Sequence, residues 1–276
     1  MKSEVYLHGQ VLGTHSFLLR GGFLKPDEYS EIDAQYFLPG GETGTAATVL
    51  SSLGVNVRMD GTHIGKEPAE LIRSFYADKS VDLSSLYFDP DYQGLMDYVI
   101  ISGFTRTPLG MFAALYQPGA KRRWSMPKEE DIIGCTVAGI DPFFLEATQA
   151  AAELCVKHHK PFVTIDSRHD SYLHRHAAVN VVSKECTAQY IADGISMEEI
   201  YRLMTENTDG LVIITRGEKE MLYGRKGQPM KQMKPFSVEV KSTLGAGDTF
   251  KAGCIYALLH GMSDDEMVRF ASACSA

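Results

Sequence analysis

The sequence has 276 residues, of which 44% are apolar and 22% are charged, an ordinary composition for a globular protein. This length suits one large α/β domain better than two independent ones. The formal net charge of −8 argues against a nucleic-acid-binding protein, because phosphate contacts need an excess of Lys and Arg. No apolar stretch approaches the ~18 residues of a membrane helix, so no membrane association is expected. The five cysteines are scattered and no signal-peptide pattern is present, which predicts a cytoplasmic protein with reduced thiols.

Short apolar runs alternate with amphipathic stretches, which is typical of βαβ units that feed a mostly parallel sheet. The predicted strands are Val5–Val11, Val55–Met59, Ile132–Ala138, Phe162–Ile165, Val179–Val182, Leu211–Thr215 and Phe236–Val240. The predicted helices are Thr45–Leu53, Glu67–Ala77, Pro142–His158, Met197–Glu206, Asp248–Leu259 and Asp264–Ala276. Ser196 and Glu199 form a capping box at the start of one of these helices. The last helix has no stop signal, which suggests that the chain continues beyond Ala276.

Two segments, approximately 14–38 and 87–124, break this alternation with strand-like runs separated by turn residues. Strands without intervening helices predict a small β-rich lid inserted into the α/β body. Such a lid would cover the carboxyl ends of the main strands, where open α/β sheets bind ligands. The whole of 1–276 is therefore expected to be one domain that carries an inserted lid.

The most informative motif is Ser242–Phe250, which lies between a predicted strand and a predicted helix. Its small residues Gly245, Ala246 and Gly247 let the backbone approach a ligand, and a helix start presents unpaired N–H groups. This arrangement suits an anion hole for a phosphoryl group, and Asp248 could accept the proton of an attacking hydroxyl. Taken alone, a glycine turn before a helix is the simpler explanation of the motif.

Of two other nucleotide-binding motifs, the Walker A loop is excluded and the dinucleotide fingerprint is disfavoured. No G-x-x-x-x-G-K-[ST] sequence occurs, so a Walker A loop is absent. The third position of a dinucleotide fingerprint holds Phe250, and the motif lies far from the first βα unit. A dinucleotide-dependent oxidoreductase is therefore a weak alternative.

Two further motifs lie at predicted strand or helix ends. Pro39–Ala47 places paired glycines before a helix, where backbone amides could meet a polar substrate. Leu211–Glu220 is a buried strand that ends in Thr-x-Gly, with Thr215 and Gly217 at the sheet edge. Each motif is explained equally well by a tight turn when it is considered alone.

Together, in this order and spacing, the three motifs resemble those of the PfkB, or ribokinase-like, carbohydrate kinases over essentially the whole chain. The resemblance implies a three-layer α/β/α fold with a mostly parallel sheet and a small β-rich lid. It also implies ATP-dependent phosphorylation of a hydroxyl on a small sugar or sugar-like metabolite, with Mg²⁺ and with Asp248 as general base. Within the superfamily, Val182–Glu185 is similar to a stretch of the ketohexokinases. A homodimer formed through the lid strands is a further expectation from the family.

The resemblance assigns roles to individual positions. The catalytic residues are Asp248 and the amides of Gly245, Ala246 and Gly247. The nucleotide-binding residues are Thr215, Gly217, Lys184 and Thr243. The substrate-binding residues are Thr14, Gly40, Gly41, Glu42, Thr45, Arg106 and Arg168. Glu185 is the metal-side acid. A surface ion pair is an equal alternative for Arg168, and a solvated helix-start residue is the simpler one for Glu185.

The departures from the family pattern gather on the substrate side. Thr14 stands where members usually carry an Asp that holds sugar hydroxyls, and Glu42 and Thr45 stand where Asn is frequent. Because a buried polar site rejects ligands that leave its groups unpaired, the substrate should change with these residues. Two alternatives therefore stay open: a non-catalytic nucleotide- or sugar-sensing protein, and a kinase of a nucleoside or another non-sugar metabolite. Ser242 replaces an Asp linked to a monovalent cation, which puts potassium activation in doubt.

Overall fold

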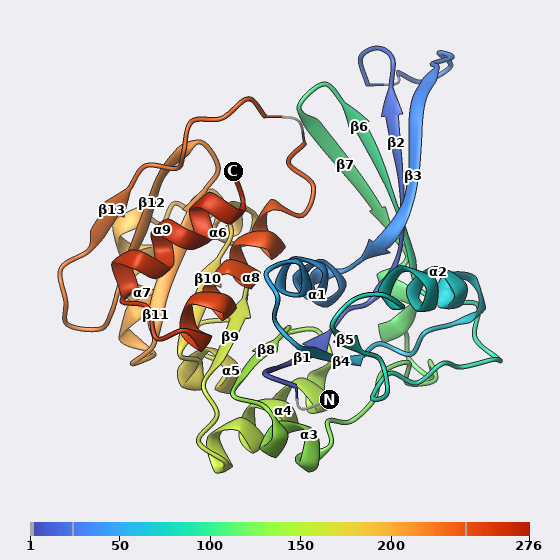
Figure 1. The fold of residues 1–276 in the computed structure, drawn as a ribbon. Coiled ribbons are helices and arrows are strands. Elements are labelled where there is room, and N and C mark those ends of the chain that lie inside the picture. The colour runs from blue at the N-terminus through green and yellow to red at the C-terminus, as the bar shows by residue number, and fades with distance from the viewer. Residues whose placement is uncertain (1–2, 24, 241) are drawn as a thin grey trace.

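A nine-stranded sheet runs through the computed structural model of the chain, which describes residues 3–23, 25–240 and 242–276 (Figure 1). Across the sheet, its strands are β13 (Lys231–Met233), β12 (Lys219–Gly224), β11 (Leu211–Arg216), β10 (Val179–Val182), β9 (Phe162–Ile165), β8 (Val137–Ile140), β1 (Val5–Gly9), β4 (Val57–Gly61) and β5 (Val81–Asp82). The strands from β11 to β5 pair in parallel, whereas β12 and β13 add an antiparallel edge. Every residue of β9 and β10 is buried, as expected for central parallel strands covered on both faces.

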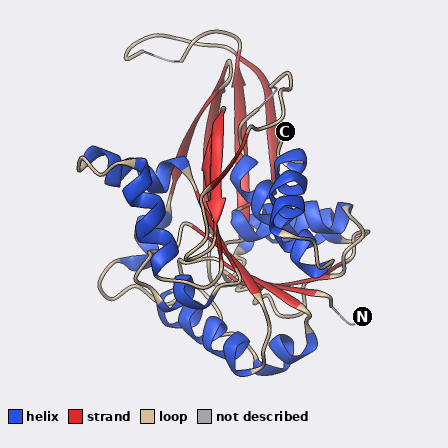
Figure 2. Ribbon diagram, turned by 90° about the vertical axis from the view of Figure 1, so that its left-hand side faces the viewer, coloured by secondary structure: helices blue, strands red, loops and turns tan. Residues whose placement is uncertain are grey.

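Helices cover both faces of this sheet (Figure 2). The helices are α1 (Glu42–Ser52), α2 (Lys66–Tyr76), α3 (Glu129–Gly134), α4 (Leu145–Lys157), α5 (Tyr172–His176), α6 (Lys184–Ala192), α7 (Met197–Glu206), α8 (Ala246–Leu259) and α9 (Asp264–Cys274). Alternate residues of one strand point to opposite layers. Leu7 packs in the cluster that holds α1, α8 and α9, whereas its neighbour Tyr6 packs against α3, α4 and α5. The three-layer α/β/α architecture expected from the sequence is therefore confirmed.

A second, four-stranded sheet stands apart from the main one (Figure 1). We call it the small sheet; its strands, in order, are β3 (Ile32–Gly40), β2 (Leu12–Leu19), β6 (Met96–Ser102) and β7 (Thr105–Gly110). A short 3-10 helix, η1 (Phe112–Tyr116), follows it. These strands lie largely within the two segments that break the helix–strand alternation, so the sequence signal of strands without helices located them correctly.

The chain reverses its direction of progress across the main sheet at β1. From β1 the chain adds β4 and β5 on one side, and it then returns to add β8 on the other. This is the topological switch point of the sheet, and open α/β folds bind ligands outside the carboxyl ends of the strands there. Gln10 follows β1 and Asp141 follows β8, so both residues lie at this point.

Two predicted strands are wrong. The range Ile132–Ala138 contains the end of α3, and β8 begins only at Val137. Acidic residues at 129–131 favour a helix start by their interaction with the helix dipole, and this outweighs the apolar run that follows. The range Phe236–Val240 forms no strand, because its residues find no partner strand; Phe236, Val238 and Val240 are exposed. The edge position beside β12 is taken by β13.

Several local expectations are confirmed. The capping box of Ser196 and Glu199 is present at the start of α7. The other predicted helices occur with ends shifted by a few residues, and α8 begins at Ala246 rather than at Asp248. Among the described residues, no helix is long and apolar enough to cross a membrane.

Candidate active site

The start of α8 is shaped by the glycine motif. Gly245 is the N-cap residue and has a φ of 74°, a left-handed conformation that glycine adopts without strain. The first N–H groups of a helix have no partner within it, which suits an anion. The amide of Ala246 donates to the carbonyl of Thr243 at 3.4 Å, outside the helix, so it would have to exchange this partner for an anion. The motif residues Gly245, Ala246 and Gly247 thus take the positions expected for an anion hole.

Asp248 lies in the first turn of α8. Burial raises the pKa of its carboxyl to about 6. The ammonium of Lys251 opposes this rise, whereas the carboxylate of Asp141 adds to it. A carboxylate with a pKa just below neutral is ionised at pH 7 and can still accept a proton readily, which suits a general base.

The paired glycines come close to α8 from the other side. Gly41 has a φ of 79°, and a Cβ atom there would lie 2.4 Å from the carbonyl oxygen of Gln10. The same carbonyl accepts hydrogen bonds from the amides of Thr43 (3.1 Å) and Gly44 (3.3 Å), so it holds the first turn of α1. α1 packs beside α8, and a Cβ atom on Gly245 would lie 3.4 Å from Cγ2 of Thr45. The two predicted motifs therefore meet in space.

Glu42 is the first residue of α1. Burial and, to a smaller extent, the nearby carboxylates of Asp141 and Asp248 together raise the pKa of its carboxyl to about 8. Its Oε2 atom is buried and has no hydrogen-bond partner among the described residues. A buried acceptor without a partner is costly, which indicates a place where a ligand donor is needed.

Thr14 has a carboxylate beside it that the sequence did not reveal. On the small sheet, Thr14 of β2 lies directly opposite Asp97 of β6. Burial raises the pKa of the Asp97 carboxyl. A hydrogen bond with Thr14 opposes this rise without cancelling it. Oδ1 of Asp97 is buried and unpartnered in the described part of the chain. Thr14 also contacts the glycine loop, since a Cβ atom on Gly40 would overlap Oγ1 of Thr14 at 1.8 Å.

Asp141 and Lys251 form a buried ion pair at the switch point, with side chains 0% and 1% exposed. Oδ2 of Asp141 also accepts hydrogen bonds from Oγ1 of Thr43 (2.8 Å) and from the amide of Gln10 (3.2 Å). Sequence reasoning missed both residues. Asp141 directly follows a buried strand, but the misplaced end of that predicted strand hid this signal.

The nucleotide-side residues lie at the ends of neighbouring strands. Thr215 is in β11, and its hydroxyl donates to the carbonyl of Val182 at 3.4 Å. Gly217 forms the turn into β12 with a φ of 65°. Lys184 is exposed at the start of α6, where the preceding Ser183 donates its amide and hydroxyl to Asp166 (2.6 and 2.8 Å). Asp166 has a φ of 50°, an unusual conformation for a residue other than glycine and one that clusters at functional sites.

Arg106 links the small sheet to the glycine motif. Its guanidinium donates a hydrogen bond to the carbonyl of Thr243, and it lies 3.8 Å from a carboxylate oxygen of Glu185. The positive charge of Arg106 lowers the pKa of Asp248, against the raising effect of burial. Arg106, Thr243 and Glu185 are therefore brought together with the catalytic motif.

Arg168 takes a different position. It forms an exposed ion pair with Asp170 at 2.7 Å, and its side chain is 79% exposed. Surface pairing, which was an equal alternative from the sequence, describes this geometry; a phosphate contact stays a prediction.

The described residues contain no group of three or more His, Cys, Asp or Glu side chains that could hold a metal ion. Glu185, with its exposed carboxylate, and Asp166 are the acidic residues on the nucleotide side.

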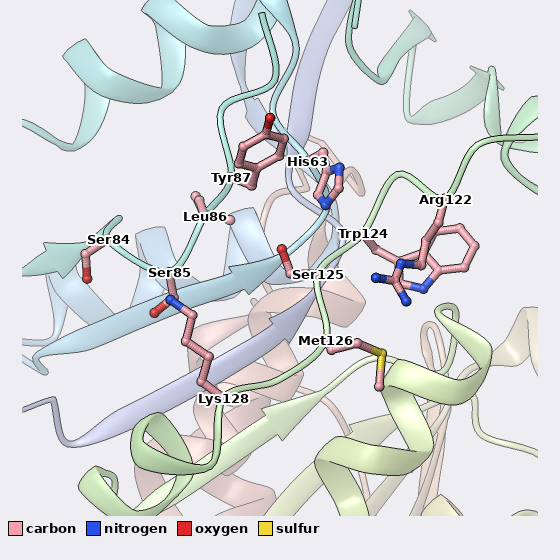
Figure 3. A pocket seen from close by; sticks show the side chains of 10 residues that line it. All are labelled: His63, Ser84, Ser85, Leu86, Tyr87, Arg122, Trp124, Ser125, Met126 and Lys128. Atoms are coloured by element: carbon pink, nitrogen blue, oxygen red, sulfur yellow. The ribbon is translucent and has the colours of Figure 1, made fainter. Parts of the chain in front are cut away.

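A cavity of about 450 Å³ lies elsewhere, beside the ends of β4 and β5 (Figure 3). Side chains of the segments 84–87 and 122–128 and of His63 line it. None of the predicted site residues is among them. The candidate site is thus defined by the meeting of the sequence motifs rather than by this cavity.

Solved structures of the same fold are numerous. A putative ribokinase from Agrobacterium tumefaciens superposes with a TM-score of 0.86 over 100% of this chain and 90% of that one, at 18% sequence identity. Arabidopsis thaliana ribokinase, complexed with ribose and ATP, gives a TM-score of 0.78 over 100% and 92% of the two chains, at 17% identity. A nucleoside kinase from Burkholderia thailandensis, in complex with inosine, gives 0.72 over 98% and 88%, at 18% identity. These similarities establish a ribokinase-like fold.

Sequence comparison adds the family. A ribokinase from Haemophilus influenzae is 43% identical over 65 residues, a match that covers 24% of this chain and only 21% of that protein. The family model described as pfkB family carbohydrate kinase matches residues 20–276. The chain therefore belongs to the pfkB family of carbohydrate kinases, phosphotransferases whose acceptor is an alcohol group.

Proposed function

We propose that this chain transfers the γ-phosphoryl group of ATP to a hydroxyl of a small sugar, nucleoside or similar polyhydroxylated metabolite, with Asp248 as general base. The observation that carries this proposal is the position of Asp248. It lies in the first turn of α8, where the first amides have no acceptor within the helix, and α1 with the paired glycines packs alongside. A purely binding protein would not need a base at that position.

Each group then has a defined task. Asp248 accepts the proton of the attacking hydroxyl, and the amides of Gly245, Ala246 and Gly247 stabilise charge on the phosphoryl group. Thr215, Gly217, Lys184 and Thr243 border the nucleotide. Mg²⁺, held on the side of Glu185, would neutralise phosphate charge when bound. Since the transition state of phosphoryl transfer is loose, most of the rate enhancement comes from positioning and charge neutralisation.

The substrate side supports a ligand with several hydrogen-bond donors. Oε2 of Glu42 and Oδ1 of Asp97 are both buried acceptors without partners in the described ranges. Hydroxyl groups of a sugar or of a ribose moiety would satisfy them, as would an amino group on such a molecule. Asp97 also places a carboxylate beside Thr14, and this weakens the argument for a non-catalytic sensing protein.

We further propose a homodimer formed through the small sheet. On β3, Ile32, Tyr36 and Leu38 are each about half exposed, and they lie on alternate positions of one strand face. On a monomer, such an apolar row would remain in water, which favours its burial against a second copy.

The test is a coupled ADP-release assay with MgATP, run across ribose, other pentoses, hexoses and nucleosides. Asp248→Asn should lower kcat on any accepted substrate by roughly 10²–10⁴-fold, because the base is lost while the fold is kept. Asp78→Asn, at an exposed position away from the site, is the matched control and should leave kcat unchanged.

Two outcomes would count against the proposal. Turnover that survives in Asp248→Asn would remove the base from its assigned role. No turnover on any substrate, combined with a rise in melting temperature on addition of ATP or ribose, would favour the sensing protein.

A further inference from the structure

The buried pair of Lys251 and Asp141 has no role in the chemistry described so far. Lys251 follows Asp248 by about one turn of α8, and its side chain is 1% exposed. A lysine is almost never fully buried unless it is paired, since its ammonium loses its hydration. Such a pair at the edge of an active site calls for a functional explanation.

Asp141 connects three separate parts of the site. Its carboxylate accepts hydrogen bonds from Gln10 after β1, from Thr43 in α1 and from Lys251 in α8. The carbonyl of Gln10 in turn holds the amides at the start of α1, directly after the glycine loop. One carboxylate therefore fixes the glycine loop relative to the helix that carries Asp248. The two helices that it connects, α1 and α8, lie side by side (Figure 1).

Lys251 also interacts electrostatically with a set of acids. Burial disfavours its charged form, but the carboxylates of Asp141, Asp248 and Glu42 together raise the pKa of Lys251. The other charged groups that act on Asp248 are Arg106 from β7 and Asp166 from the end of β9. Lys251 has the largest favourable effect on the ionised form of Asp248 among all of these groups.

We propose that Lys251 and Asp141 are positioning residues of this enzyme: Asp141 holds the glycine loop against α8, and the Lys251 ammonium, fixed by Asp141, places a positive charge about one helical turn from Asp248. The two residues act through Asp248 and the loop, and neither needs to touch the substrate. The kinetic consequences rest on the proposed kinase function, whereas the effect on the ionisation of Asp248 does not.

The roles of the two residues can be separated because they bear opposite charges. Lys251→Met removes the favourable charge, so the pKa of Asp248 should rise by at least about one unit. Asp141→Asn removes a repulsive charge, so the same pKa should fall. Thr43→Val removes one hydrogen bond to Asp141 without changing any charge, and it should leave that pKa unchanged. A pair that serves only the stability of the core would not move the pKa in opposite directions.

The first measurement is carboxyl ¹³C NMR on the full chain, titrated from pH 4 to pH 9, with the Asp248 resonance assigned by its loss in Asp248→Asn. This readout requires no substrate, so it remains valid if the proposed kinase activity is wrong. Lys157→Met removes an exposed lysine–carboxylate pair with Glu129 and serves as the matched control. Coincident titrations of Asp248 in the wild type, Lys251→Met and Asp141→Asn would overturn the proposal.

The second measurement is the pH dependence of kcat/KM on the substrate identified by the ADP-release assay. For Lys251→Met, a rise of one unit from a pKa of about 6 should lower kcat/KM about threefold near pH 6.5 and about tenfold near pH 5, with recovery above pH 8. Lys251→Arg keeps the charge, so kcat/KM at acidic pH should return to the wild-type value. Thr43→Val should raise KM without shifting the pH dependence of kcat/KM. If Lys251→Met does not fold, Asp141→Asn still tests the sign of the charge effect, and an unchanged or raised Asp248 pKa in that variant contradicts it.

Discussion

The two halves of the site are built from different groups. The half proposed to bind the substrate, around α1 and the small sheet, has side-chain carboxylates at Glu42 and Asp97, each with one buried oxygen that lacks a partner among the described residues. The nucleotide half, around α8 and β11, consists mainly of backbone amides, glycine turns and hydroxyls, and Lys184 and Glu185 are exposed there. Backbone groups suit a ligand that is the same throughout a family, whereas side-chain carboxylates can be changed one at a time. We infer that substrate choice is set almost entirely on the first side.

The largest expected effect is a loss of stability caused by a substitution in the glycine loop of the substrate half. Gly41→Ala places a Cβ atom 2.4 Å from the Gln10 carbonyl at a φ of 79°, so the loop must move. We expect a loss of about 3–5 kcal/mol in the free energy of unfolding, measured in urea. Gly54→Ala has a similar φ of 83° but open space around it, and it should lose only about 1 kcal/mol. Equal losses in the two variants would show that the contact with Gln10 does not constrain the loop.

Glu42 should make stability depend on pH. Its folded-state pKa is raised, so its stabilising contribution is complete below about pH 4.5 and is lost as the pH rises through about 8. Glu42→Gln has no charge to bury, and it should become more stable than the wild type by roughly 2–4 kcal/mol above pH 8. The measurement is urea unfolding at pH 5, 7 and 9. The control is Glu67→Gln, an exposed residue in the first turn of α2, which should show no such trend. A constant difference between Glu42→Gln and the wild type at all three pH values would contradict the burial of an ionisable acid.

The smallest expected effect is a change in KM for one of the two ligands, which tests whether the two halves are independent. Asp97→Asn should raise the KM of the acceptor substrate about 10–30-fold and leave the KM of ATP unchanged, because Asp97 lies only on the substrate side. Thr14→Ala should have a smaller effect of the same kind, and the double variant should be non-additive since the two side chains interact. Asp33→Asn, on the exposed face of the same small sheet, is the control. A parallel rise in the KM of ATP would mean that the halves are not independent.

The sequence predicted the glycine turns of both halves better than the contacts between distant segments, for a physical reason. Glycine turns before helices leave local signals in the sequence, and both motifs lie where they were expected, with Gly245 and Gly41 in left-handed conformations. Asp97 becomes relevant only through its register with Thr14 across parallel strands. Lys251 looked like an ordinary helix residue, because its partner Asp141 is 110 positions away. Contacts between distant segments depend on sheet order, which local patterns do not specify.

The prediction of the main sheet from local sequence patterns was limited in the same way. The alternation of apolar runs correctly predicted the parallel core, but the antiparallel edge formed by β12 and β13 was missed. The apolar positions of Phe236–Val240 suggested a strand that could have formed only if a neighbour had been available. An alternating apolar pattern therefore shows that a segment can form a strand. Whether it does so depends on a neighbouring strand in the tertiary structure.

The contact of Arg106 with the carbonyl of Thr243 joins residues 137 positions apart. One lies on the small sheet and the other in the loop before α8, so this hydrogen bond ties the two parts of the candidate site together. The same Thr243 carbonyl also accepts from the amide of Ala246, the first residue of α8. A displacement of β7 away from the body would therefore change the hydrogen bonding at the start of α8.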